Sequence, residues 1–504
     1  MKKLNLLFIS ILSMSFMYGQ DITDALRYSQ DEIQGSARFR ALSGAFGALG
    51  GDMSAVSLNP AGSAVFAKSH ASFSLSNVDT KNDTQYFNGF TSASDSKFDF
   101  NQGGTVFVFA NNDSNSPWKK FAVSIGYDKM ANYDNVWVAN GTNTNNNSID
   151  LYFLGYADGL RLDEISALPG ESISDAYSEI GSFYGFGHQQ AFLGYESYIL
   201  EPDTNDDANT TYFSNLANGT FDQEYIYATR GYNGKITFNA AVQYEDNLFL
   251  GLNLNSHLLH YDRSTQLFED NSNLGSIINN IDFENTLSTI GTGFSFQLGG
   301  ILKVTNEFRL GLTYDSPTWY TMEEETTQYL YTNSDIDGPA RVNPQIVNIY
   351  PSYRLQTPGK ITGSLAYVFG DKGLLSFDYS LKDYGSAKFK PTSDSFFAVQ
   401  NRVINNDLVA ASTYRFGAEY RVNQFSFRGG YRFEESPYKN GVTVGDLSGY
   451  SFGIGFNLGN TKLDLTYDQA NRSSQTQLYN VGLTDAAMID ARNSNVTFSI
   501  GFNI

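Results

Sequence analysis

The amino-acid sequence predicts an all-β protein, a transmembrane antiparallel β-barrel of about 14 strands whose lumen is plugged by an N-terminal segment. Three observations lead to this fold: an export signal, strands in which apolar and polar residues alternate, and connections that are alternately tight and long. The composition agrees, because the 504 residues include 46 Gly, 39 Phe and 33 Tyr but no Cys. Such a chain is typical of outer-membrane barrels.

Residues 1–19 predict a secretory signal peptide. Two lysines precede an apolar run at 4–16, and small Gly19 precedes Gln20. The run is too short for a retained membrane anchor, so we expect cleavage after Gly19. The absence of Cys excludes a lipoprotein, a disulfide scaffold and thiolate metal sites.

Residues 20–67 predict a hatch inside the barrel. The stretch GGDMSAVSLNPAGSAVF at 50–66 is rich in small residues, which can pack closely against a barrel wall. Pro60 fixes its own φ and biases Asn59 toward an extended backbone, so this turn is rigid. The alternative is a loose periplasmic tail.

Residues 68–504 predict the barrel itself. In the last strand, Val496, Phe498, Ile500 and Phe502 alternate with small or polar residues. The same period of two recurs in the segments 248–255, 308–315, 375–382, 414–421, 425–434 and 462–468. Charged residues recur on the polar face, so that face cannot meet lipid. Closure of the sheet leaves no unpaired edge in the bilayer.

The connections predict the orientation. Tight turns occur at 245–247, 305–306, 370–372, 422–424 and 459–461, and longer polar stretches lie between them. This is the rhythm of periplasmic turns and extracellular loops, so both chain ends face the periplasm. The longest connection, 139–221, spans roughly 80 residues and predicts a large extracellular loop or lid, with a short helix at 171–180.

Several stretches resemble the FadL-like outer-membrane transporters of hydrophobic compounds (the FadL/TodX family). They are ARFRALSGAFGALGGDMSAVSLNPAGSAVF at 37–66, FRLGLTYDSP at 308–317 and the hairpins at 355–389 and 414–437. Together they cover nearly all of the mature chain. The hatch motif of the resemblance comprises Gly51, Asp52, Asn59, Pro60, Ala61 and Gly62. The fifth–sixth loop, 269–282, is short here, whereas in the family it dominates the mouth.

The resemblance implies that a ligand is captured at the cell surface and leaves sideways, through a wall gap at an inward kink in the third strand. In this chain the third strand is predicted at 121–137, and its alternation fails around Asp128, Met130 and Asn132. An irregularity of this kind indicates a kink or bulge, or else simple fraying. We expect Asn59 and Pro60 to position the hatch against this strand and to satisfy its freed backbone groups.

Four arginines are candidate contacts for a ligand head group in the lumen: Arg415, Arg421, Arg428 and Arg432. They lie on the polar face of two adjacent strands and could bind a carboxylate bidentately. The alternative is an internal charge ladder with nearby acidic residues, namely Asp378, Glu419, Glu434, Asp464 and Asp468.

The sequence contains no recognisable catalytic, phosphate-binding or metal-binding motif, so we expect neither an enzyme nor a cofactor. His257 and His260 are three apart on a strand and face opposite sides. We expect passive transport of hydrophobic molecules, such as long-chain fatty acids or other lipophiles, by a monomer in the outer membrane of a Gram-negative bacterium. Its partners would be the hydrophobic ligand and membrane lipid, and a net charge of −20 argues against nucleic acid.

The alternative function is that of an accessory barrel of a protein secretion system, which binds a secreted protein partner. The lumen discriminates between the two functions. A continuous apolar tunnel from the mouth to a wall gap favours transport, and a filled lumen favours partner binding.

Overall fold

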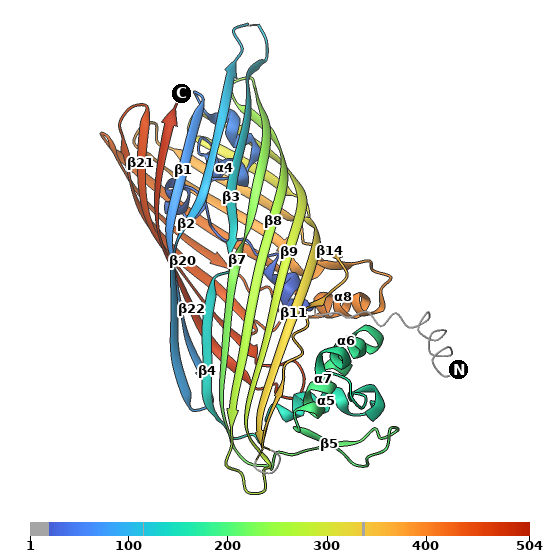
Figure 1. Ribbon diagram of the computed structural model, residues 1–504. Helices are drawn as coiled ribbons and strands as arrows, with labels where there is room; N and C mark the ends of the chain where they lie inside the picture. Colours follow the sequence, from blue (N-terminus) through green and yellow to red (C-terminus); the bar gives the residue numbers. More distant parts are fainter. Residues whose placement is uncertain (1–19, 114, 335–337) are drawn as a thin grey trace.

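Strands of alternating polarity close into a long barrel, with helices inside its lumen and beside one end (Figure 1). The computed structural model describes residues 20–113, 115–334 and 338–504, so the predicted signal peptide at 1–19 lies outside the described residues. The wall is a closed antiparallel barrel of fourteen strands, which confirms the predicted fold class. Among the described residues, no helix is long and apolar enough to cross a membrane.

The first half of the wall contains the longest strands. In order these are β1 (His70–Tyr86), β2 (Gly89–Ala110), a third strand split into β3 (Trp118–Asn132) and β4 (Asn135–Asn143), β7 (Phe221–Tyr244), β8 (Leu248–Asp270) and β9 (Ile278–Lys303). The seventh strand is likewise split, into β10 (Phe308–Asp315) and β11 (Trp319–Ser334).

The second half is shorter and more broken. The eighth strand comprises β12 (Gly338–Val342), β13 (Asn348–Ile349), β14 (Tyr353–Gln356) and β15 (Lys360–Val368). It is followed by β16 (Gly373–Asp383), β17 (Lys388–Lys390), β18 (Ala410–Val422), β19 (Phe425–Glu434), β20 (Val444–Asn457), β21 (Thr461–Gln477) and β22 (Ala486–Asn503). Sixteen residue pairs between β1 and β22, from His70↔Asn503 to Gln85↔Met488, close the barrel.

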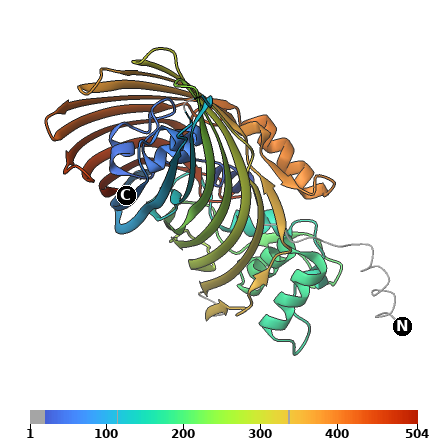
Figure 2. The same ribbon diagram turned by 90° about the horizontal axis from the view of Figure 1, so that it is seen from above.

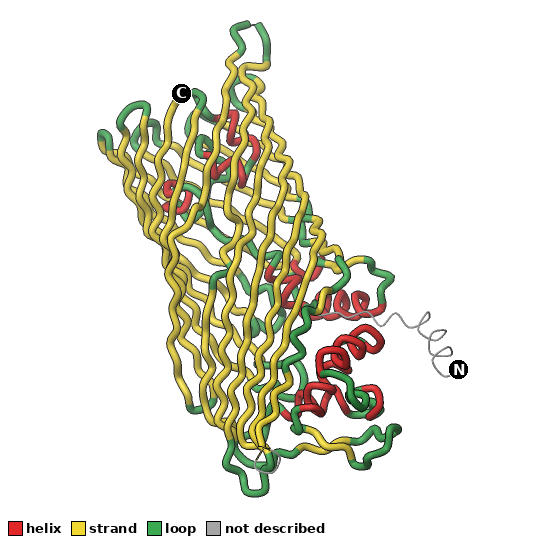
Figure 3. The backbone as a smooth tube through the Cα atoms, viewed as in Figure 1, coloured by secondary structure: helices red, strands yellow, loops and turns green. Residues whose placement is uncertain are grey.

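The rim of the barrel is uneven. Strand β9 has 26 residues and spans about 85 Å at about 3.3 Å per residue, whereas β15 has only 9 residues. About 9–11 residues suffice to cross an outer membrane, so the long strands continue well beyond it at the end with long connections. Helices and loops occupy the low side of this rim (Figure 3).

A helical subdomain follows the third strand. It contains α5 (Asp150–Ala157), the 3₁₀ turn η2 (Leu162–Glu164), α6 (Ile173–Tyr184), α7 (Phe186–Glu196) and the hairpin β5 (Leu200–Pro202)–β6 (Tyr212–Ser214). The helix expected at 171–180 corresponds to α6. The connection starts at 144 rather than at 139, because Asn140 to Asn143 still pair with β7. These polar residues continue the strand because it runs beyond the membrane at this point.

The connection at 391–406, read from the sequence as a polar loop, contains a further helix. Between β16 and β18 lie the 3₁₀ turn η3 (Tyr384–Ser386) and α8 (Ser395–Asp407). Asp394 caps α8 by accepting the backbone N–H groups of Phe396 and Phe397. The apolar face of α8 packs against α2 (Ile22–Arg27), the first helix among the described residues, through Leu26, Phe397 and Ile404.

The N-terminal segment lies inside the barrel. It forms α2, α3 (Ala37–Ala41), α4 (Met53–Leu58) and the 3₁₀ turn η1 (Pro60–Val65), and most residues from 33 to 64 are buried. Seen along the barrel, these short helices sit within the ring of strands, while the helical subdomain and α8 lie to one side (Figure 2). We refer to residues 20–67 as the hatch.

Candidate functional site: the hatch, the lumen and a seam in the wall

The residues of the predicted hatch motif build two consecutive caps. The Asp52 carboxylate accepts the backbone N–H of Ser54 at 2.9 Å and starts α4. Asn59 ends α4, and its Oδ1 accepts the N–H of Ala61 at 3.1 Å, so it also starts η1. Pro60 occupies the first position of η1, where its missing N–H costs nothing.

The two motif glycines allow the chain to turn there. Gly51 has a φ of +70°, in the left-handed region that favours glycine. A Cβ on Gly62 would lie 3.3 Å from the Cα of Gly50, so the two backbone segments touch. These residues therefore shape the hatch itself.

Asn59 faces the sixth strand, so the expectation that it contacts the third strand is wrong. Its Nδ2 donates to the carbonyl oxygens of Gly47 at 2.6 Å and of Gly300, on β9, at 3.2 Å. The third strand meets the hatch elsewhere. The Ser57 hydroxyl donates to Asp128, and Lys120 Nζ donates to the carbonyls of Ala64 and Phe66.

Inward-facing glycines let the hatch backbone approach the wall. A Cβ added to Gly251 would lie 2.3 Å from the carbonyl carbon of Pro60. A Cβ added to Gly311 would lie 2.3 Å from the carbonyl oxygen of Gly47, and one added to Gly430 would lie 2.6 Å from the carbonyl carbon of Leu42. Real Cβ atoms do not come this close, so side chains at these wall positions would displace the hatch.

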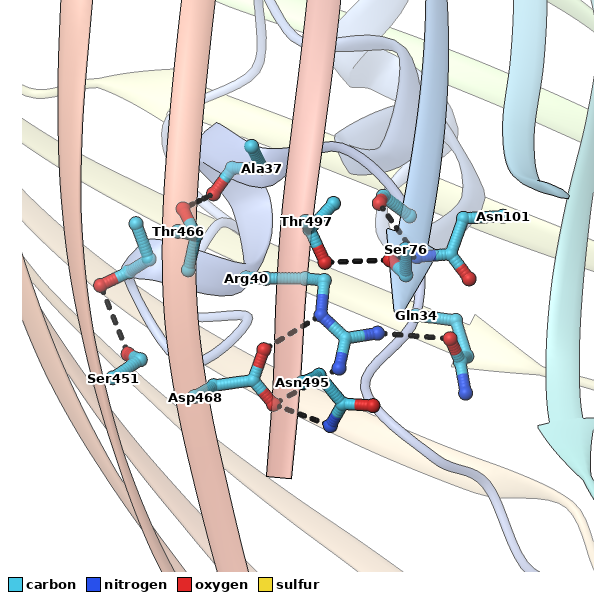
Figure 4. Close-up of polar contacts among 12 residues, drawn as sticks. Gln34, Ala37, Arg40, Ser76, Asn101, Ser451, Thr466, Asp468, Asn495 and Thr497 are labelled. Carbon is cyan, nitrogen blue, oxygen red and sulfur yellow. Dashed lines mark hydrogen bonds and ion pairs between the residues drawn. The ribbon is translucent and has the colours of Figure 1, made fainter. Parts of the chain in front are cut away.

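Buried polar contacts fix the middle of the hatch to the last strands (Figure 4). The Arg40 side chain is only 1% exposed; its Nε and Nη2 donate to the two oxygens of Asp468 at 2.7 and 2.9 Å, and its Nη1 donates to Gln34 at 2.8 Å. The Thr466 hydroxyl donates to the carbonyl of Ala37 at 2.5 Å. A buried guanidinium with a bidentate ion pair and a third hydrogen bond has a strictly defined position.

The wall has a seam between the second and third strands. The β2–β3 ladder runs from Ala110↔Lys120 to Gln102↔Asp128 and ends there. Beyond that point, the β1–β2 ladder skips Asn101, β2 from 89 to 100 pairs only with β1, and β4 pairs only with β7. We call these facing stretches, 89–101 and 129–143, the seam.

The predicted kink residues lie at the start of the seam. The β3–β7 register slips between Lys129 and Ala131, which leaves Met130 as the extra residue. Asp128 is the last residue paired with β2, and Asn132 is the last residue of β3 before the interruption.

Glu32 of the hatch satisfies the backbone groups that this irregularity leaves free. Its N–H donates to the carbonyl of Met130 at 3.1 Å, and its Oε2 accepts the N–H of Asn132 at 3.1 Å. Burial raises the pKa of Glu32 above its usual value. The sequence analysis gave this role to Asn59 and missed Glu32, because only the tertiary structure places 32 beside 130.

A neighbouring carboxylate anchors the same segment. Asp31 Oδ2 lies 2.9 Å from Lys360 Nζ and 3.1 Å from Lys382 Nζ. Although burial acts in the opposite direction, these two ammonium groups hold the pKa of Asp31 well below its usual range.

A cavity of about 330 Å³ lies in the middle of the lumen and extends to the seam. Its lining combines hatch residues 30–34, the third-strand residues 131–135 and the far wall. Tyr133, Tyr227 and Tyr261 contribute aromatic surface, and most of the other lining side chains are polar or charged. The cavity is therefore a polar chamber with some aromatic walls, rather than part of a continuous apolar tunnel.

The four candidate arginines fall into two groups. Arg421 and Arg428 bind Glu419 at 2.5 and 2.6 Å, and Arg38 of the hatch joins them at 3.0 Å, which forms a charge ladder outside the cavity. Arg415 and Arg432 line the cavity.

The two cavity arginines differ in their partners. Arg432 Nη1 lies 3.4 Å from Glu434. Arg415 is 8% exposed, and its Nε has no hydrogen-bond partner among the described residues. Arg415 is thus the candidate with unused capacity to bind an anion.

The helical subdomain packs against the ends of the long wall strands, on the side of the barrel with long connections. Tyr152 and Phe153 of α5 contact Phe283 of β9, with ring centroids 5.9 and 5.2 Å apart. Tyr152 also contacts Tyr479, in the connection between β21 and β22, at 4.9 Å. Residues from both sides form one large apolar core, so the subdomain is docked onto the barrel.

One carboxylate ties the subdomain to the connection between β21 and β22. The Asp485 side chain accepts the amide groups of Asn143, Asn145 and Asn147 at 2.8–2.9 Å. Asn143 is the last residue of β4, and Asn145 and Asn147 belong to the segment that links β4 to α5. No group of three or more His, Cys, Asp or Glu side chains suited to a metal ion occurs within the described ranges.

Comparison with known proteins identifies solved structures that share this fold. No family model and no curated protein matches the sequence. Among solved structures, the chain is similar to a Pseudomonas aeruginosa FadL homologue, with a TM-score of 0.56, 12% identity and coverage of 94% of this chain and 99% of that one. It is similar to the Pseudomonas putida toluene transporter TodX, with a TM-score of 0.53, 13% identity and coverage of 94% and 100%.

A third similar structure is the CymD monoaromatic hydrocarbon channel, with a TM-score of 0.50, 12% identity and coverage of 93% of this chain and 97% of that one. Identity this low establishes the fold and nothing about the ligand. The barrel is thus of the FadL type over nearly its whole length, as the sequence resemblance implies.

Proposed function

We propose that this protein is a passive transporter in the outer membrane of a Gram-negative bacterium, and that it passes hydrophobic molecules sideways from its lumen into the membrane. The observation that carries the proposal is the position of the cavity. It reaches the wall at 131–135, where the β2–β3 ladder has already ended. A molecule in the cavity therefore faces the part of the wall that lacks backbone pairing. A concentration gradient drives the movement, without a cofactor or a catalytic step, and a monomer suffices.

The polar lining favours an amphiphile over a plain hydrocarbon. A neutral hydrocarbon would displace water from the buried charged groups without forming hydrogen bonds to them, which costs free energy. A ligand with an anionic head and an apolar tail can bind Arg415 Nε while the tail contacts Tyr133 and Tyr261. Long-chain fatty acids have this chemistry.

An uptake assay with a fluorescent long-chain fatty acid tests the proposal. Cells that produce the protein are compared with cells carrying Arg415→Gln, and Arg421→Gln serves as the matched control because Arg421 lies outside the cavity lining. A lost charge-assisted hydrogen bond is worth about 1.5–3 kcal/mol, so we expect half-saturation to need about 10- to 100-fold more ligand in Arg415→Gln. Equal uptake by both variants would assign no role to Arg415, and absence of uptake by the unaltered protein would reject transport.

The docked subdomain and the polar lumen support a second candidate function, that of an accessory barrel which binds a secreted protein. The helical subdomain and the wall share one apolar core, and the cavity lining is largely polar. Purification from the native membrane separates the two functions. Stoichiometric recovery of an exported protein, together with unchanged fatty acid uptake on deletion of the gene, would favour the accessory role.

A further inference from the structure

The seam is crossed by side chains where the backbone ladder is missing. Thr91 Oγ1 donates across the seam to the carbonyl of Val138, and Asn82 Nδ2 of the neighbouring strand β1 donates to the carbonyl of Val136 at 2.7 Å. Both contacts lie toward the extracellular end of the seam. Nearer its start, at 97–99 and 129–134, the bridging groups are charged.

Two ion pairs of opposite polarity cross the seam at this point. Lys97 Nζ of the second strand lies 2.8 Å from Asp134 Oδ2 of the third, and Asp99 of the second strand pairs with Lys129 of the third. Each strand thus contributes one cation and one anion. This arrangement fixes which residues face each other, because a shift along the strand would bring like charges together.

Contacts with β7 hold the two third-strand partners, Asp134 and Lys129, in place. Asp134 Oδ1 accepts the N–H of Gly231 on β7 at 3.1 Å, and the Asp134 side chain is only 4% exposed. Lys129 is 7% exposed and lies over the ring of Tyr232 at 5.8 Å. Lys97 is 55% exposed, so it can leave its partner without rearrangement of the fold.

The two faces of the seam differ in chemistry. The cavity reaches Ala131 to Asn135 from the inside. On the outside, Phe98 is 67% exposed, and Phe100 stacks on Tyr127 with centroids 5.5 Å apart and planes 9° apart. A polar chamber and an aromatic outer surface are therefore separated by the ion-paired stretch.

We propose that the Lys97–Asp134 and Asp99–Lys129 pairs hold the seam closed, and that their separation opens the passage from the lumen to the lipid. The inference rests on the proposed lateral exit and adds the element that controls it. Side-chain pairs can separate and re-form while the backbone ladders on either side stay intact. Loss of Lys97 or Asp99 leaves its buried third-strand partner unpaired, which favours the open seam.

Charge reversal tests the closing role without reference to transport. Ala131 lies on the inner side of the seam and is 3% exposed. Because the chain has no Cys, the substitution Ala131→Cys introduces a single thiol as a reporter. In membranes, we expect a lipid-soluble maleimide to label it at least several-fold faster when Lys97→Asp or Asp134→Lys is present alone. The combination of both reversals should return the rate to that of the parent. Equal rates in all four proteins would overturn the proposal.

Cross-linking tests whether seam opening limits transport. Lys97→Cys with Asp134→Cys is joined by a short bismaleimide, and Thr105→Cys with Ile125→Cys is the matched control, because those residues are paired in the intact part of the same ladder. We expect fatty acid uptake to fall to background in the first pair and to stay unchanged in the control. Full uptake through a cross-linked seam would refute control at this site. If the reversals change labelling while the parent transports nothing, the ion pairs keep their closing role and the proposed function fails.

Discussion

At the scale of single residues, Glu32 is the group on which the third strand depends. A bulge in a wall strand frees backbone groups that lipid cannot satisfy, and Glu32 supplies both a donor and an acceptor to them. The Asn59 amide could also satisfy such backbone groups, but it instead donates to the carbonyl of Gly300 on β9. Residue type alone therefore does not decide which polar side chain repairs a break in a ladder.

The raised pKa of Glu32 predicts a pH dependence of stability. Burial favours the protonated form, so the folded state binds this proton more tightly than the unfolded state, in which the value is near 4.5. The contribution of this group to the free energy of unfolding is therefore most favourable below about pH 4.5, and it is lost as the pH rises through the higher folded value. Because glutamine does not titrate, we expect the free energy of unfolding of Glu32→Gln not to show this decrease as the pH rises.

Denaturant unfolding of the detergent-solubilised protein from pH 4 to pH 8 measures the effect. The informative quantity is the difference between the parent and Glu32→Gln at each pH, because other carboxyl groups titrate in both proteins. A difference that does not change with pH would contradict the assignment.

At the scale of elements, the hatch is seated by shape as well as by hydrogen bonds. Inward glycines on several strands leave room for its backbone, and each is matched to one particular part of the hatch. These positions read in the sequence as ordinary small residues on the polar face of a strand. Only the docked hatch explains why a side chain there would not fit.

We expect Gly311→Val to loosen the hatch and Gly363→Val to leave it in place. The first Cβ would lie 2.3 Å from the carbonyl oxygen of Gly47, whereas the second meets nothing within 4 Å, although Gly363 lies on the neighbouring strand opposite Leu312. Overpacking of this kind costs about 1–3 kcal/mol. Hydrogen exchange of the hatch amides measures the effect, and we expect faster exchange in Gly311→Val but not in Gly363→Val. Equal protection of the hatch in both variants would show that the wall strands move to accommodate the side chain.

At the scale of the whole molecule, the uneven rim explains where the helical subdomain sits. Long strands β7 to β9 extend on one side of the mouth, and the short strands β15 to β19 leave the other side low. The subdomain packs its apolar core onto the extended strands and is tied by Asp485 to the connection before β22. It is a docked part of the barrel end rather than a loose loop.

This architecture predicts that residues 144–220 face the outside of the cell. The tight turns lie at the opposite end of the barrel, and the turn side is periplasmic in outer-membrane barrels. A protease site inserted at 203–208, in the exposed β5–β6 connection, should be cut in intact cells. The same site inserted at 459–461 should be cut only after the outer membrane is broken, and the reverse pattern would invert the topology.

The sequence by itself determined the barrel, its approximate strand number and the presence of a small-residue segment for the lumen. These features are local: alternation has a period of two, turns have their own residue types, and both can be read along the chain. The caps formed by Asp52 and Asn59 are local for the same reason.

The tertiary structure alone decided which distant groups meet. Alternation placed all four arginines on the polar face, but the pairing with Glu419 and the free Nε of Arg415 depend on strand register and on the docked hatch. The contact of Glu32 with the third strand, the choice of β9 for Asn59 and the ion pairs across the seam join residues up to 241 positions apart. No local pattern encodes such contacts, because they exist only once the barrel has closed around the hatch.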